Sequence, residues 1–171
     1  MTAPLEIKID PRLKNVTMAD LQKEFDLATK IAADNTRLHT AVNQIHELRS
    51  KFVTLRRWAG DNKDAQAVVD AADQFDKKMT PIEEQLMQVQ MKSSEGNLRY
   101  PNMLNEQYDS LSHSVEYADA APTASTYGVY DSLHRRLEEQ LAKWNELVKT
   151  DLPGLNQLMH SHNVPSLRVG E

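Results

Sequence analysis

Apolar residues recur at alternating steps of three and four in four successive stretches of the chain, between Leu21 and Leu158. This spacing puts one apolar side chain per turn on a single face of a helix, and each such face needs a partner to leave water. Four faces joined by short polar breaks predict an all-α fold, an elongated antiparallel up-down four-helix bundle. The second stretch has its apolar positions at Val68, Ala72, Phe75, Met79, Ile82, Leu86 and Val89. The third has them at Leu104, Tyr108, Leu111, Val115 and Ala118.

The first helix is expected to begin after Thr17, with Asp20 completing an approximate capping box. It should run to about Ala59, where Gly60 and the Arg56-Arg57 pair are typical of a helix C-terminus. At about 42 residues it would be roughly 63 Å long. Asn35 interrupts its apolar face, either as a buried residue that fixes the register or as a solvated one on a slightly rotated helix. The predicted face is Leu21, Phe25, Ala28, Ile31, Leu38, Val42, Ile45, Leu48, Phe52 and Leu55.

The second helix is predicted from about Lys63 to Lys92, with Pro81 in its middle. Thr80-Pro81 would also suit the start of a new helix, but the apolar spacing passes through the proline and favours one kinked helix. Residues 93–97 are predicted to be a loop. The third helix is expected from Tyr100-Pro101 to about Ala120.

The fourth helix is expected to be capped by Thr123 and to continue past Pro153, with a kink or short break at Asp151. Because the first and fourth helices are the long ones, an alternating order would bring residues 18–32 alongside residues 148–162. Both ends of the chain would then lie at one end of the rod. The predicted apolar face of the fourth helix is Tyr130, Leu133, Leu137, Leu141, Trp144, Leu147, Val148, Leu152, Leu155 and Leu158.

Residues 4–10 alternate apolar and polar positions, with Leu5, Ile7 and Ile9 on one face, which predicts a short N-terminal β-like segment. A lone strand has no ladder to join. It therefore pairs with another copy or is the last strand of a preceding β-domain, and the second interpretation is favoured. The predicted organisation is a remnant strand and linker over residues 1–16, the helical bundle over 17–163 and a C-terminal tail over 164–171.

Composition narrows the functional classes. The 171 residues carry a net charge of −5 with both signs interspersed, which argues against a nucleic-acid surface. There is no cysteine, so thiolate metal sites and disulfides are excluded. No apolar run approaches the roughly 20 residues that span a bilayer, and the residues after Met1 do not form a signal peptide.

The histidines are the first candidates for chemistry. His39 and His46 are seven residues apart on one helical face, and Asp131 and His134 have the spacing of a carboxylate–histidine ligand pair. A bundle di-metal site normally uses two such acid-x-x-His units and two further glutamates. Only one unit occurs, so no metal site is predicted. Two further histidines near the tail, expected to be solvated, are His160 and His162.

Other chemistry finds little support. The chain lacks a Gly-x-Ser-x-Gly nucleophile elbow and glycine-rich phosphate loops. Adjacent carboxylates diverge on a helix, so the pairs Glu83-Glu84 and Glu138-Glu139 are expected to be solvated. No catalytic or cofactor-binding residue and no cofactor is therefore predicted, and the chain is not expected to be an enzyme. Residues interpreted as packing groups are Met79 in the core, Met87 and Met91 in a side row, and the two anchors Trp58 and Trp144.

Four segments carry a resemblance to a known family, in matching order over nearly the whole chain. They are residues 4–12 (PLEIKIDPR), 92–105 (KSSEGNLRYPNMLN), 117–123 (YADAAPT) and 149–156 (KTDLPGLN). They resemble the C-terminal helical region of bacterial proteins with sortilin-like (Vps10-type) BNR-repeat β-propellers, often labelled glycosyl hydrolases. Pro81 departs from the uninterrupted helix expected at that point.

The resemblance implies a parent protein whose propeller and any catalytic residues lie upstream, and it carries no site residue over to this chain. It also implies an exported parent, so the expected location is periplasmic or extracellular. The expected function is a non-catalytic structural or protein-interaction appendage, with the upstream β-domain, a protein partner or a second copy as partners. Alternatives are a free-standing helical adaptor or oligomerisation module, and an accessory part of a carbohydrate-active enzyme whose site lies elsewhere.

Overall fold

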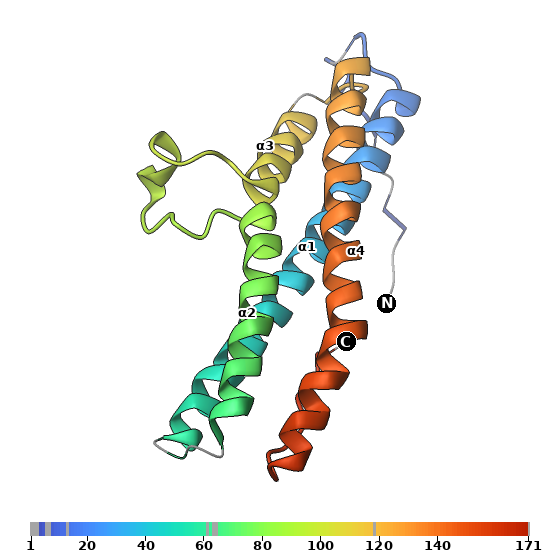
Figure 1. Ribbon diagram of the computed structural model, residues 1–171. Coiled ribbons are helices and arrows are strands. Elements are labelled where there is room, and N and C mark those ends of the chain that lie inside the picture. The colour runs from blue at the N-terminus through green and yellow to red at the C-terminus, as the bar shows by residue number, and fades with distance from the viewer. Residues whose placement is uncertain are drawn as a thin grey trace.

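The computed structural model of the protein describes residues 4, 5, 8–12, 14–60, 62, 65–117 and 119–170. These residues form the α-helices α1 (Met18–Ala59), α2 (Gln66–Leu86), α3 (Leu104–Glu116) and α4 (Ala124–Ser161), with a short 3-10 helix, η2 (Ser94–Leu98). The described residues contain no strand. The helices lie alongside one another (Figure 1) and pack around one main apolar core, which confirms the predicted all-α four-helix bundle.

Helix α1 begins and ends where the sequence predicts. The Thr17 hydroxyl accepts a hydrogen bond from the Asp20 amide at 3.2 Å, and the Asp20 carboxylate accepts from the Thr17 amide at 3.1 Å. This reciprocal pair is the capping box. At the other end Gly60 has a φ of 49°, in the left-handed region that glycine adopts without steric cost. Both ends are therefore determined by contacts within a few residues of the chain.

The buried face of α1 is rotated from the predicted one in its first half. Phe25 is exposed and Leu21 and Ala28 are only half-buried, so the predicted start of the face is wrong. Its core positions follow steps of four and three without interruption. They are Leu27, Ile31, Asp34, Leu38, Ala41, Ile45, Leu48, Phe52, Leu55 and Ala59, and the predicted Val42 is buried beside Ala41.

Helix α2 is continuous through Pro81, which confirms the single-helix interpretation. It ends at Leu86, six residues earlier than predicted, because Met87 is extended and the following residues turn away. Gln88 fixes that turn by donating from Nε2 to the Pro101 carbonyl at 2.9 Å. Val89, predicted on the apolar face, is exposed. The predicted start at Lys63 lies outside the described residues.

Helix α3 is shorter than predicted at both ends. It begins at Leu104 rather than at Tyr100-Pro101, because the Glu106 carboxylate accepts from the Met103 amide at 2.8 Å and so caps the first turn. It ends at Glu116 rather than near Ala120. Its four predicted apolar positions from Leu104 to Val115 are buried, and Ala118 lies outside the described residues.

Helix α4 begins after Thr123, whose hydroxyl accepts from the Thr126 amide at 3.2 Å, as predicted. It continues without a break at Asp151 and through Pro153 to Ser161. Asp151 instead pairs with Lys78 of α2 on the surface of the bundle. Of the predicted kink or short break at Asp151, the break is therefore wrong. The last core position of the helix is Met159 rather than Leu158.

The helices do not strictly alternate in direction (Figure 1). Contacts of α1 with α4 pair residue 34 with 134, 37 with 138 and 44 with 144, so these two long helices run parallel. Helices α2 and α3 follow one another in the opposite direction, since the connection over residues 87–103 loops out without reversing the chain. The predicted overlap of residues 18–32 with 148–162 is wrong for this reason.

The chain ends differ from the prediction as well. Helix α1 begins at the end of the rod where α4 begins, whereas α4 ends at the opposite end, near Trp58. Residues 4, 5 and 8–10 of the predicted strand are in no strand, and residues 6 and 7 lie outside the described residues. The segment after α4 folds back along the bundle and buries Leu167 in the core.

Candidate functional site

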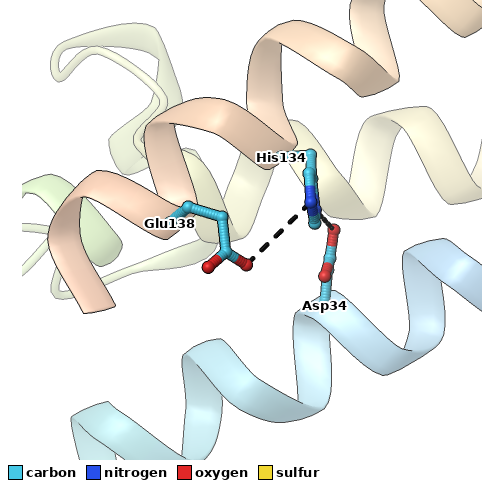
Figure 2. Close-up of side chains that lie close together, drawn as sticks. All are labelled: Asp34, His134 and Glu138. Atoms are coloured by element: carbon cyan, nitrogen blue, oxygen red, sulfur yellow. Dashed lines mark hydrogen bonds and ion pairs between the residues drawn. The ribbon is translucent and has the colours of Figure 1, made fainter. Parts of the chain in front are cut away.

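The most unusual group in the structure is the carboxylate of Asp34, which occupies a core position of α1 and is 3% exposed. Its Oδ2 accepts a hydrogen bond from the Tyr108 hydroxyl of α3 at 3.1 Å. The same oxygen lies 2.7 Å from His134 Nδ1 of α4. Figure 2 shows His134 directed between Asp34 and Glu138. Three helices therefore meet at one buried negative charge.

Arg37, one turn after Asp34, supplies the positive charge of this cluster. Its NH1 lies 3.3 Å from Asp34 Oδ1 and 2.5 Å from Glu138 Oε1. The hydrogen bond with Glu138 raises the pKa of Arg37, and the same bond lowers the pKa of Glu138. The guanidinium thus joins α1 to α4 and offsets the buried carboxylate.

Two tyrosines complete the surroundings of Asp34. Burial and, after it, the negative charge of Asp34 raise the pKa of Tyr108 well above its usual range. The same two causes raise the pKa of Tyr130 to about 12. The Tyr130 ring also stacks on His134, with ring centroids 5.6 Å apart. Both hydroxyls therefore remain protonated donors beside an acceptor that cannot reach bulk water.

A second cluster of the same kind lies between α1 and α2. Glu83 is 3% exposed, with His46 Nε2 at 2.6 Å from Oε1 and Arg49 NH1 at 2.7 Å from Oε2. Arg49 also contacts Asp76, at 3.0 Å from its Nε. The prediction that Glu83 is solvated is wrong, because α1 covers it. Each cluster places a buried acid between a histidine and an arginine.

Asp34, His134 and Glu138 also offer ligand atoms that lie within 4.8 Å of one another. A divalent cation at this point would face the permanent charge of Arg37, which already contacts both carboxylates. The carboxylates are thus paired, and a metal would have to displace the guanidinium. The geometry is that of a neutralised ion-pair network rather than an open ligand set.

The other candidates from the sequence are not brought together. His134 pairs with Asp34 and not with Asp131, which is exposed. His39 is exposed, whereas His46 faces Glu83, so these two histidines do not share a site. Among the expected packing anchors, Trp144 is buried and donates from Nε1 to Gln44 at 2.8 Å, but Trp58 is 53% exposed. His160 is exposed and His162 half-buried.

Sequence reasoning missed Asp34 and examined Asn35 instead. The signal was present, because steps of four and three counted back from Ala59 arrive at Asp34. Counting forward from Leu21 and Phe25 shifted the register by one position. Asn35 is half-buried and contacts Asp109 of α3 at 3.4 Å, beside the core. Asn35 therefore matches neither alternative in full, because the helix is rotated but Asn35 Oδ1 does not reach solvent and its amide contacts a polar residue of α3.

Fold and site together define an all-α bundle whose buried charges join its helices. Within the described residues, none of the helices combines the length and apolarity that crossing a membrane requires. Comparison with known proteins finds no family model, no curated protein and no solved structure that matches this chain.

Proposed function

We propose that this chain is a non-catalytic helical-bundle domain that acts as a structural or protein-interaction appendage of an exported β-propeller protein. The observation that carries the non-catalytic part is the use of its buried charges. Oδ2 of Asp34 and both oxygens of Glu83 are engaged by side chains of neighbouring helices, and Oδ1 of Asp34 is engaged by Arg37 of its own helix. Groups held in this way join helices and are not free to bind or activate a substrate.

The rod shape supports the structural part of the proposal. Helices α1 and α4 both extend along the rod, and polar contacts join them at two levels, between Asp34 and His134 and between Gln44 and Trp144. A rigid rod of this kind suits a spacer or a mount for a neighbouring domain. The β-propeller parent and its export rest on the resemblance of the four sequence segments alone.

Two experiments test the proposal. The first determines the DNA sequence upstream of the Met1 codon. We expect the open reading frame to continue there into β-repeats. A stop codon followed by a native start at Met1 would contradict the parent assignment. The second deletes residues 18–163 from the parent and measures its thermal midpoint and its kcat. A lower midpoint with unchanged kcat is expected. A loss of kcat at unchanged stability would instead make the bundle an accessory part of a carbohydrate-active enzyme.

The alternative of a free-standing adaptor or oligomerisation module has one observation in its favour. Met18 and Phe25, seven residues apart on α1, are both exposed on the same side of the helix. Analytical ultracentrifugation of the chain and of the Phe25→Glu variant distinguishes the cases. An oligomer that Phe25→Glu dissociates would favour the adaptor, and a monomer for both chains would favour the appendage.

A further inference from the structure

An open groove of about 860 Å³ lies between α2 and α4. Its floor is apolar, because Ile82 of α2 and Leu147 of α4 belong to the main core and also line it. Most of its other lining residues are polar or charged. They belong to neither the Asp34 cluster nor the Glu83 cluster, so the groove is a separate feature of the bundle.

Gln140 is a polar residue at a core position of α4, and it is only 8% exposed. It lines the groove, so the small exposed part of this residue faces the groove. Within the residues that the structure describes, no group forms a hydrogen bond with its side-chain amide. An unpaired amide is costly to bury, and buried amides in proteins are nearly always paired. Gln140 therefore marks a point where a bound molecule would supply a donor or an acceptor.

Two charged side chains of α4 also line the groove without an ion-pair partner among the described residues. They are Lys143 and Glu146. Lys78 and Asp151, in contrast, pair with each other at the end of the groove away from Gln140. The groove thus offers a free positive charge near the Gln140 amide and a free negative charge about one turn further along α4.

This order of groups fits a short peptide with free ends. Its carboxylate would accept from the Gln140 amide and pair with Lys143, and its ammonium group would pair with Glu146. Gln140 and Glu146 are six residues apart, roughly 9 Å along the helix, and three extended residues span roughly 10 Å. An apolar side chain in the middle of such a peptide would lie on Ile82 and Leu147.

We propose that the groove between α2 and α4 binds a short zwitterionic peptide with an apolar central side chain. The carboxylate lies at Gln140 and Lys143, and the ammonium group lies at Glu146. This binding site goes beyond the proposed function, because a structural appendage does not require one. It also gives a reason for an unpaired amide at a core position, which lowers the stability of the chain when no peptide is bound.

The test titrates the isotope-labelled full chain with the tripeptide Ala-Leu-Ala and follows the amide resonances by NMR. The side-chain resonances of Gln140, identified by their loss in Gln140→Leu, should shift with a Kd of roughly 0.1–1 mM, as expected for a small ligand in an open site. The same peptide with an acetylated N-terminus and an amidated C-terminus lacks both charges. It should bind at least about threefold more weakly.

Four variants locate the charged contacts. Lys143→Ala and Glu146→Gln should each weaken the binding of Ala-Leu-Ala about two- to fivefold, as expected for the loss of one exposed ion pair. Lys149→Ala and Glu139→Gln are the matched controls, because Lys149 and Glu139 are exposed on the same helix and lie outside the groove. Both controls should leave the Kd unchanged.

Gln140→Leu distinguishes a binding role of Gln140 from a purely structural one. Leucine replaces the unpaired amide by an apolar side chain, so the thermal midpoint without peptide should rise by roughly 2–4 °C. The same substitution should weaken peptide binding about two- to tenfold, because one hydrogen bond is lost. An amide that only held the fold together would instead show a lower midpoint and an unchanged Kd.

Four results would overturn the proposal. They are the absence of any shift of the Gln140 resonances with Ala-Leu-Ala, equal binding of the blocked peptide, a lower midpoint for Gln140→Leu, and control variants that weaken binding as much as Lys143→Ala does. None of them bears on the deletion of residues 18–163 or on the sequence upstream of Met1. The proposed function therefore stands or fails separately.

Discussion

Substitution of Asp34 should reveal how much the buried charges contribute to stability. Asp34→Ala leaves the buried Tyr108 hydroxyl without its acceptor at 3.1 Å, which costs about 1–3 kcal/mol. It also breaks an ion pair, which costs about 3–5 kcal/mol when both partners are buried. The side chains of His134 and Arg37 are 41% and 45% exposed, so water solvates them once the carboxylate is gone. We therefore expect a loss of about 2–4 kcal/mol in the free energy of unfolding.

The assay is urea unfolding followed by far-ultraviolet circular dichroism, with the thermal midpoint as a second readout. For a chain of this length the expected loss corresponds to roughly 4–16 °C in the midpoint. Asp26→Ala is the matched control, because Asp26 is an exposed aspartate of the same helix that accepts a surface bond from Gln22. Its effect should stay within about 0.5 kcal/mol.

A double variant separates the hydroxyl from the charge. Tyr108→Phe removes the donor that Asp34→Ala leaves unpaired. The double variant should therefore lose less free energy of unfolding than the sum of the two single losses, by about 1 kcal/mol or more. The reasoning is refuted if Asp34→Ala unfolds at the same urea concentration as the wild type. Strict additivity of the two substitutions would show that the hydroxyl and the carboxylate are not coupled.

Three further outcomes follow from the same contacts. Leu111→Asp buries an unpaired charge on α3 and should cost several kcal/mol of a total free energy of unfolding of roughly 5–15 kcal/mol, so the chain should unfold. An unchanged thermal midpoint would contradict the assignment of the apolar face of α3. The pKa of Tyr130 is raised from 10.0 to about 12, so its contribution to stability is complete below pH 10 and is lost as the pH rises to about 12. Alkaline unfolding of Tyr130→Phe should therefore show a smaller loss over that interval. Zinc should shift the thermal midpoint by no more than about a degree, because Arg37 occupies both carboxylates of the Asp34 cluster, and a clear stabilisation would revive the metal interpretation.

Much of the secondary structure was predictable because it depends on neighbours in the sequence. The capping box of Thr17 and Asp20, the turn at Gly60 and the cap at Thr123 all act within four residues. Steps of three and four likewise determine which side of a helix is apolar. The predictions were wrong for the end of α2 and the start of α3. The chain after α2 is held by a contact between more distant residues, from Gln88 to Pro101.

The sequence by itself determined that the fold is an all-α four-helix bundle, approximately where α1 and α4 begin and end, and that their apolar faces pack together. Tertiary structure alone decided that α3 continues in the direction of α2, so that α1 and α4 run parallel and their ends separate. It also decided that Asp34 and Glu83 are buried. The physical reason is that burial and direction depend on side chains far along the chain: Asp34 meets Tyr108 and His134, and Leu167 meets Asn156, only after the helices have packed.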